Sequence, residues 1–269
     1  ILEIIYSTAV AVVFFVLLLS GSKMTFMLYI QAAALGLLVY ALFVFVRYRE
    51  YLHPALFDMS RVKTLLPYGL YSVLGSVGLF ILWNSDKFFL NKFFDAQTVG
   101  IYAAYYGASL IVLGRIATIL MKVFLPTVSA NRNKLEIMKK MNKLMKISCI
   151  PLFLFNILLI YVMVLIFGRE YPVNIYWIML FSINAVMHTF INMKGSLLAA
   201  EGVRGLGLYA RYAIMMALLV LIMNFILIPR FGIYGGIFSV IIVSILFLGG
   251  ISLHSKDILA RGDAMLKAK

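Results

Sequence analysis

The chain has 269 residues, of which 64% are hydrophobic and 13% are charged, and its mean hydropathy is +1.03. Soluble domains are about half apolar and about a quarter charged, so this composition excludes an ordinary soluble protein. The charge is basic, with 24 Lys and Arg against 10 Asp and Glu. In a membrane protein the position of these charges is more informative than their sum, and we expect no nucleic-acid partner.

Eight apolar runs follow one another along the chain, each close to or above the roughly 20 residues that a helix needs to cross a bilayer. They cover about Ile4–Ser20, Met24–Val46, Leu65–Phe93, Val99–Val128, Ile147–Phe167, Val173–Leu198, Leu206–Ile228 and Ile233–Leu253. Long runs without strict alternation indicate helices and not barrel strands. We therefore predict an all-α, polytopic integral membrane protein with about eight transmembrane helices.

The third and fourth runs predict a helical hairpin. The third is entered through Pro67 and closed by the polar segment Asn84–Lys87, a tight turn follows at Asp95–Thr98, and the fourth ends at Pro126. So short a turn forces the two helices to pack antiparallel. Because both runs contain ionisable residues, which are costly in lipid, we interpret the hairpin as one wall of a polar cavity.

The loops between the runs alternate in charge, with 15 Lys and Arg on one side of the membrane against 4 on the other. The basic side holds Arg47, Arg49, Arg61, Lys63, Arg132, Lys134, Lys139, Lys140, Lys143, Lys146, Arg204, Lys256, Arg261, Lys267 and Lys269, and the other side holds Lys23, Lys92, Arg169 and Arg230. The positive-inside rule places the basic side and the C-terminus in the cytoplasm.

The cytoplasmic loop before the fifth run has a helical period of its own. Leu135, Met138, Met141 and Met145 recur on one face, with lysines on the other. This pattern predicts a helix lying on an anionic leaflet, or else a solvated loop with chance periodicity.

Two features concern the chain as a whole. It opens inside an apolar run without Met, so we expect it to be the C-terminal part of a longer protein. Its single cysteine, Cys149, excludes an intrachain disulfide and is interpreted as a small core residue.

Several short motifs resemble a known family. The central hairpin carries Asn84-x-Asp86-Lys87-Phe88-x-Leu90, then Val99-Gly100-Ile101-Tyr102, then Phe124-Leu125-Pro126. Later turns carry Gly168-x-Glu170-Tyr171 and Ile228-Pro229-x-Phe231-Gly232-Ile233-x-Gly235. In this order, from about Leu65 to the end, they resemble polysaccharide (O-antigen type) flippases of the MATE-like transporter superfamily. The family's usual Gly-Ala after the last turn is Gly235-Gly236 here.

The resemblance implies a fold of two six-helix lobes. Residues 1–46 would be two helices that end the N-lobe, 47–64 the cytoplasmic inter-lobe loop, 65–253 the six-helix C-lobe and 254–269 a cytoplasmic tail. The implied function is transport, by alternating access, of a polyprenyl-diphosphate-linked oligosaccharide to the outer leaflet of the bacterial inner membrane. The implied partners are that lipid-linked substrate, the bilayer and other polysaccharide-assembly membrane proteins.

Five cations within runs are candidates for holding the substrate diphosphate: Arg115, Lys122, Lys87, Lys194 and Arg211. Arg115, Thr118 and Lys122 share one helix face, and arginine binds phosphate oxygens bidentately. The alternative for Lys122, Lys194 and Arg211 is anchoring at the cytoplasmic interface.

Asp86 is the one carboxylate inside the central runs. It is a candidate for ion coupling or for a structural pair with another helix, Arg115 being one option. Asn84, Lys87 and Asn91 share a second face of that run, and the stripe of Asn184, His188 and Asn192 either lines a sugar path or joins helices. Tyr102, Tyr105 and Tyr106 fit an interfacial aromatic belt, with sugar stacking as the alternative.

Other function classes are less well supported. A drug or cation antiporter of the same fold would favour a carboxylate-rich cavity, and a membrane-embedded polysaccharide transferase or polymerase would need a base in a longer outer loop. A non-transporting assembly subunit is a further alternative. No phosphate loop, HExxH motif or paired cysteine ligands are present, so we expect neither an enzyme nor a cofactor or metal.

Overall fold

The structure is a computed structural model that describes residues 8, 10–16, 26–49, 58–130, 134–168 and 170–267. Only the backbone is described at residues 26–29, 111–112, 115–117, 119–130, 134–135 and 256–267. Most of the first apolar run, Lys23, Arg132, Arg169 and the last two residues lie outside the described parts. So do the side chains of Arg115 and Lys122.

Every secondary-structure element in the described ranges is a helix, which confirms the all-α fold. The elements are α2 (Phe26–Tyr48), α3 (Met59–Phe93), α4 (Ala96–Ala130), α5 (Lys134–Phe167), α6 (Ile175–Ala199), α7 (Val203–Phe231) and α8 (Ile233–Lys267). Among the described side chains, six helices are long and apolar enough to cross a membrane: α2, α3, α5, α6, α7 and α8. The chain is thus a multi-pass membrane protein.

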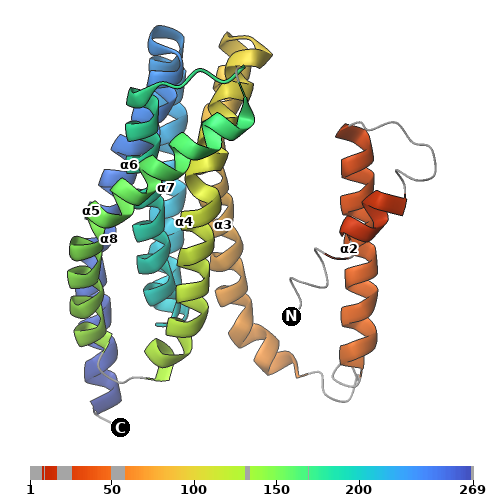
Figure 1. The fold of residues 1–269 in the computed structure, drawn as a ribbon. Coiled ribbons are helices and arrows are strands. Elements are labelled where there is room, and N and C mark those ends of the chain that lie inside the picture. Colours follow the sequence, from red (N-terminus) through yellow and green to blue (C-terminus); the bar gives the residue numbers. More distant parts are fainter. Residues whose placement is uncertain are drawn as a thin grey trace. The chain divides into compact units, whose positions relative to one another are not determined.

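The chain divides into two compact units, Ile1–Lys63 and Thr64–Lys269. The second unit contains α4 to α8 and nearly all of α3. In it the turns α3–α4, α5–α6 and α7–α8 lie at one end of the bundle, and the turn α6–α7 lies at the other (Figure 1). This alternation matches the charge alternation of the loops.

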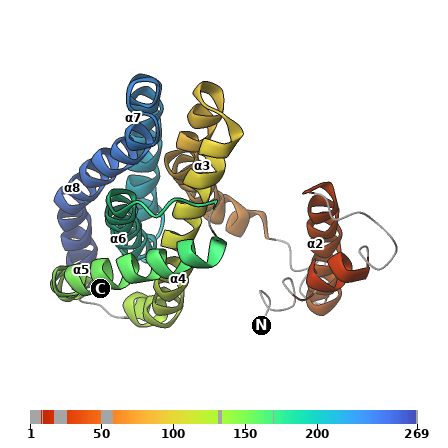
Figure 2. The same cartoon turned by 45° about the horizontal axis from the view of Figure 1, so that its top comes forward.

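Helix α6 runs through the middle of the second unit and packs against α4, α5, α7 and α8 (Figure 2). Its apolar side chains Phe181, Ile191 and Leu198 are each part of a buried core cluster. Outward-facing side chains such as Phe88, Ile166 and Leu253 are apolar and exposed. Apolar groups both in the core and on the perimeter are expected of a bundle whose solvent is lipid.

Helix α3 begins earlier than the sequence predicted. The carboxylate of Asp58 accepts a hydrogen bond from the backbone N–H of Ser60 at 2.9 Å, and this cap starts the helix at Met59, so Pro67 lies inside it. The polar segment Asn84–Lys87 does not close the helix either, because α3 continues to Phe93.

The α3–α4 turn is tighter than predicted. It contains only Phe94 and Asp95, and Ala96–Thr98 already form the first turn of α4. Asp95 caps α4, since its carboxylate accepts the backbone N–H of Thr98 at 2.7 Å. Hydrogen bonds from the Thr98 side chain and backbone lower the pKa of Asp95.

Pro126 does not end its helix as expected, and a glycine separates the last two helices. Pro126 and Pro229 lie inside α4 and α7, so neither proline stops its helix. The break between α7 and α8 is Gly232 alone, whose φ of 56° lies in the left-handed region that favours glycine.

The prediction that the segment before the fifth run forms a helix lying on the membrane surface is wrong. Residues 134–145 continue directly into the membrane part of α5, and Met138, Met141 and Met145 are buried. They form a core cluster with Leu113, Val186 and Phe190 of α4 and α6. The apolar face was identified correctly, but it packs against protein and not against a leaflet.

Candidate functional site

A polar cluster joins α3 and α4 within the bundle, and Asp86 is its centre. The Asp86 side chain is fully buried. One carboxylate oxygen accepts a hydrogen bond from the Tyr102 hydroxyl of α4. The other accepts the backbone N–H of Lys87 at 2.7 Å and lies 3.5 Å from the Lys87 ammonium.

Lys87 has a second set of contacts on its own helix and on α4. Its ammonium donates to the backbone carbonyl of Trp83 at 3.0 Å and to the Asn84 side chain at 3.4 Å. It also lies 3.5 Å from the centroid of the Tyr106 ring, which is a cation–π contact. Asn84 and Lys87 therefore share a face as predicted, and an aromatic ring of α4 covers the cation.

The contacts of Asp86 match the predicted structural pair with another helix, but the partner is Tyr102. Arg115 lies 13 residues after Tyr102 on α4, which is about 20 Å along the helix axis. The adjacent Lys87 also contributes, because its long side chain folds back toward the carboxylate. A buried carboxylate needs such partners, since an unpaired charge in lipid would be costly.

The interpretation of the three tyrosines as an interfacial belt is wrong. Tyr102 and Tyr105 are fully buried, and Tyr106 covers Lys87. The Tyr105 hydroxyl donates to the carbonyl of Pro172 and accepts the backbone N–H of Asn174 at 3.0 Å, which ties α4 to the start of α6. The sequence holds a signal for the contact between Asp86 and Tyr102. Each of the two residues lies eight positions from Phe94 in the α3–α4 turn, so an antiparallel hairpin places them at the same level.

The polar stripe on α6 lies inside the bundle. The side chains of His188 and Asn192 contact each other at 3.1 Å, and the His188 ring packs edge-on against Trp83 of α3 with ring centroids 4.5 Å apart. Asn184 is buried, and its carbonyl oxygen has no hydrogen-bond partner within the described part of the chain. The His188–Trp83 contact links α6 to α3, whereas the His188–Asn192 contact lies within α6.

The remaining candidate cations do not gather in one place. Arg211 is exposed, and its guanidinium donates to the carbonyl of Gly207 one turn earlier on α7. Asn91 is exposed near the end of α3. Arg115 and Lys122 lie on α4 where only the backbone is described, and Thr118 between them is exposed and donates to the Gly114 carbonyl at 2.8 Å.

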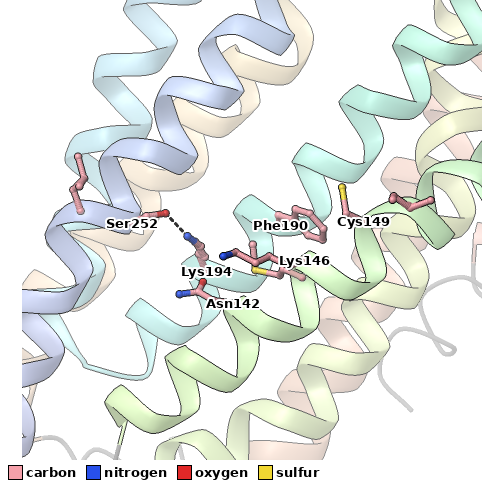
Figure 3. Close-up of a pocket in the computed structure, with 9 residues that line it drawn as sticks. Asn142, Lys146, Cys149, Phe190, Lys194 and Ser252 are labelled. Carbon is pink, nitrogen blue, oxygen red and sulfur yellow. Dashed lines mark hydrogen bonds between the residues drawn. The ribbon is translucent and has the colours of Figure 1, made fainter.

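Lys194 belongs to a different site, a pocket of about 680 Å³ between α5, α6 and α8 (Figure 3). Its ammonium donates a hydrogen bond to the Ser252 hydroxyl of α8. Lys146 and Asn142 of α5 also line this pocket, and sequence reasoning treated Lys146 only as a loop charge. The missed signal was the helical spacing of Asn142, Lys146 and Cys149, which places all three on one face.

Comparison with known proteins gives one match. Residues 1–132 match the model of a family described as "Polysaccharide biosynthesis protein". No curated protein and no solved structure matches the chain.

The matched residues include α2, α3 and α4, and therefore the cluster of Asp86, Lys87 and Tyr102. The motifs around Gly168 and Gly232, which contributed to the resemblance, lie beyond them. The process to which the match points is polysaccharide biosynthesis, and the resemblance to polysaccharide flippases is confirmed at the level of the family. Residues 1–132 are thus similar to the polysaccharide biosynthesis protein family.

Proposed function

We propose that this chain is part of a flippase that moves a polyprenyl-diphosphate-linked oligosaccharide from the cytoplasmic to the outer leaflet by alternating access. On this proposal the protein is a transporter and not an enzyme. It resides in the bacterial inner membrane with its C-terminus in the cytoplasm. The unit Thr64–Lys269 is then the C-lobe, and the helices of the unit Ile1–Lys63 end the N-lobe.

One observation supports the proposal most directly. Lys87, within the residues that match the family, holds a positive charge inside a membrane bundle next to an aromatic ring and an amide. A cation attracts a diphosphate, and aromatic and amide groups suit the sugar that the diphosphate carries. Lys87 is only partly covered, with 23% of its side chain exposed, so a ligand can reach it.

Arg115 and Lys122 extend this cationic path on the proposal. Both lie on α4, the helix that carries Tyr102 and Tyr106, and both lie farther from the α3–α4 turn. A diphosphate entering at the cytoplasmic end would meet Lys122 first, then Arg115 and finally Lys87. Lys194 and Arg211, which lie apart from this path, are left out of the proposed substrate site.

The test is restoration of surface polysaccharide in a flippase-null strain by variants of the full-length protein. Lys87→Ala and Tyr106→Leu should reduce surface polysaccharide strongly at matched membrane abundance, whereas Tyr106→Phe keeps the ring and should retain it. Lys92→Ala, an exposed lysine of the same helix, is the matched control. Full restoration by Lys87→Ala would remove this lysine from the substrate path.

A further inference from the structure

The pocket between α5, α6 and α8 lies on the perimeter of the second unit. Ile150 of α5 and Leu253 of α8 line its mouth and are 67% and 71% exposed, which marks the mouth as an apolar surface. Met145 and Phe190 line its interior. A pocket that opens through exposed apolar side chains of a membrane bundle opens toward lipid.

One side of the same pocket is cationic. Lys194 is only 8% exposed, and its ammonium lies against the Ser252 hydroxyl. The Lys146 and Asn142 side chains of α5 point into the same space between α5 and α8 (Figure 3). Two ammonium groups, an amide and a hydroxyl form a set of donors that suits an anion with several oxygens.

The depth of the pocket fits a lipid headgroup. Lys146 is the last lysine of the basic half of α5, and the apolar half of that helix starts at Ile147. The pocket therefore straddles the boundary between polar and apolar surface along α5. Basic pockets between helices at this level are typical binding sites for phosphate-bearing lipid headgroups.

We propose that this pocket binds the phosphate headgroup of a membrane lipid, held by Lys146 and Lys194, with the lipid chain lying along Ile150 and Leu253. Two sources share this chemistry, an anionic glycerophospholipid of the bilayer and a polyprenyl phosphate. The site differs from the Lys87 cluster in every residue and does not rest on the proposed transport function.

Cys149 lines the pocket and is the one cysteine of the sequence, so it serves as a built-in reporter. The experiment measures the rate at which N-ethylmaleimide labels Cys149 in the purified protein in detergent, with lipids added in turn. Phosphatidylglycerol or a polyprenyl phosphate should slow the labelling, and the one that does so at lower concentration identifies the source. Diacylglycerol, which has the chains but no phosphate, and inorganic phosphate, which has no chain, should leave the rate unchanged.

Substitutions then test the two lysines. Lys146→Gln should raise the lipid concentration needed for half-protection about fivefold, which corresponds to the roughly 1 kcal/mol that one lysine near the surface contributes. Lys143→Gln removes an exposed lysine of the same helix outside the pocket and should leave that concentration unchanged. Lys146 is itself exposed, so its substitution tests the site without disturbing the core. Lys194→Gln is the second substitution, and it is used in the labelling experiment if the variant unfolds at the same temperature as the parent protein.

The outcomes separate cleanly. Protection by a lipid phosphate that weakens in Lys146→Gln and not in Lys143→Gln supports the site. Equal protection by diacylglycerol would show that only the apolar chains are recognised and would overturn the role of the cations. Protection by inorganic phosphate alone, or protection unchanged in Lys146→Gln, would overturn the lipid headgroup site.

Discussion

The Tyr102 hydroxyl of α4 donates a hydrogen bond to the fully buried carboxylate of Asp86 on α3, across 16 residues of sequence. The Lys87 ammonium lies 3.5 Å from the same carboxylate. The two oxygens of Asp86 therefore each have a donor, and this favours the structural-pair interpretation of Asp86 over ion coupling.

The first prediction concerns this pair. Tyr102→Phe removes one donor and leaves a buried carboxylate oxygen unsatisfied, so it should lower the free energy of unfolding by about 1–3 kcal/mol. The measurement is thermal unfolding in detergent, with Tyr161→Phe on the exposed surface as the control. Asp86→Asn should also destabilise but retain transport per molecule, and loss of transport in a stably folded Asp86→Asn protein would restore ion coupling as its role.

The second prediction concerns the methionine face of α5. Met141 is 3% exposed and packs against α4 and α6, whereas Leu144 on the same helix is 53% exposed. Met141→Ala should cost about 2–5 kcal/mol because it leaves a cavity in a packed core, and Leu144→Ala should cost far less. Equal effects of the two substitutions on the unfolding temperature would favour a helix lying on the membrane surface.

The helices could largely be predicted from the sequence because lipid leaves the backbone few choices. An apolar run long enough to span a bilayer must be helical, so the apolar runs of the sequence indicated the helices α2 to α8. The ends were less predictable because capping by Asp58 and Asp95 decided where α3 and α4 begin, and Pro126, at which the fourth run was expected to end, lies within α4.

The environment of each side chain was harder to predict. The period of Met138, Met141 and Met145 shows an apolar face, but lipid and protein both favour such a face, so the sequence does not tell which one covers it. The contact of Asp86 with Tyr102 depends on the register of the hairpin, which a two-residue turn fixes and a four-residue turn would shift. The pocket of Lys146 and Lys194 combines residues of α5, α6 and α8, and their side-by-side packing depends on the tertiary fold.

The third prediction is the orientation of the membrane bundle. The excess of 15 basic loop residues against 4 places Lys139 in the cytoplasm and Asp95 outside. Single cysteines at these positions in a Cys149→Ser background, labelled in intact cells with an impermeant maleimide, give the test. Residue 95 should react and residue 139 should not, and the reverse pattern would overturn the orientation.

The last prediction concerns Arg115 on the proposed substrate path. It lies 19 residues after the start of α4 at Ala96, which is about 28 Å along the helix, and a bilayer core is about 30 Å thick. With the α3–α4 turn outside, this position is in the cytoplasmic half of the membrane, where a cation must meet water, a carboxylate or an anionic ligand. Asp86 is bonded to Tyr102 and Lys87, about 20 Å away along α4, and on the proposed function the diphosphate of a substrate is the anionic partner of Arg115.

A guanidinium can hold two phosphate oxygens at once, and an ammonium cannot. Arg115→Lys in the full-length protein should therefore reduce surface polysaccharide in a flippase-null strain while membrane abundance stays normal, and Arg115→Ala should abolish it. Lys122→Ala should have a milder effect if that side chain only reaches the interface. Normal surface polysaccharide with Arg115→Ala, at matched abundance, would exclude Arg115 from the substrate path and leave Lys87 as the cation on which the proposed site depends.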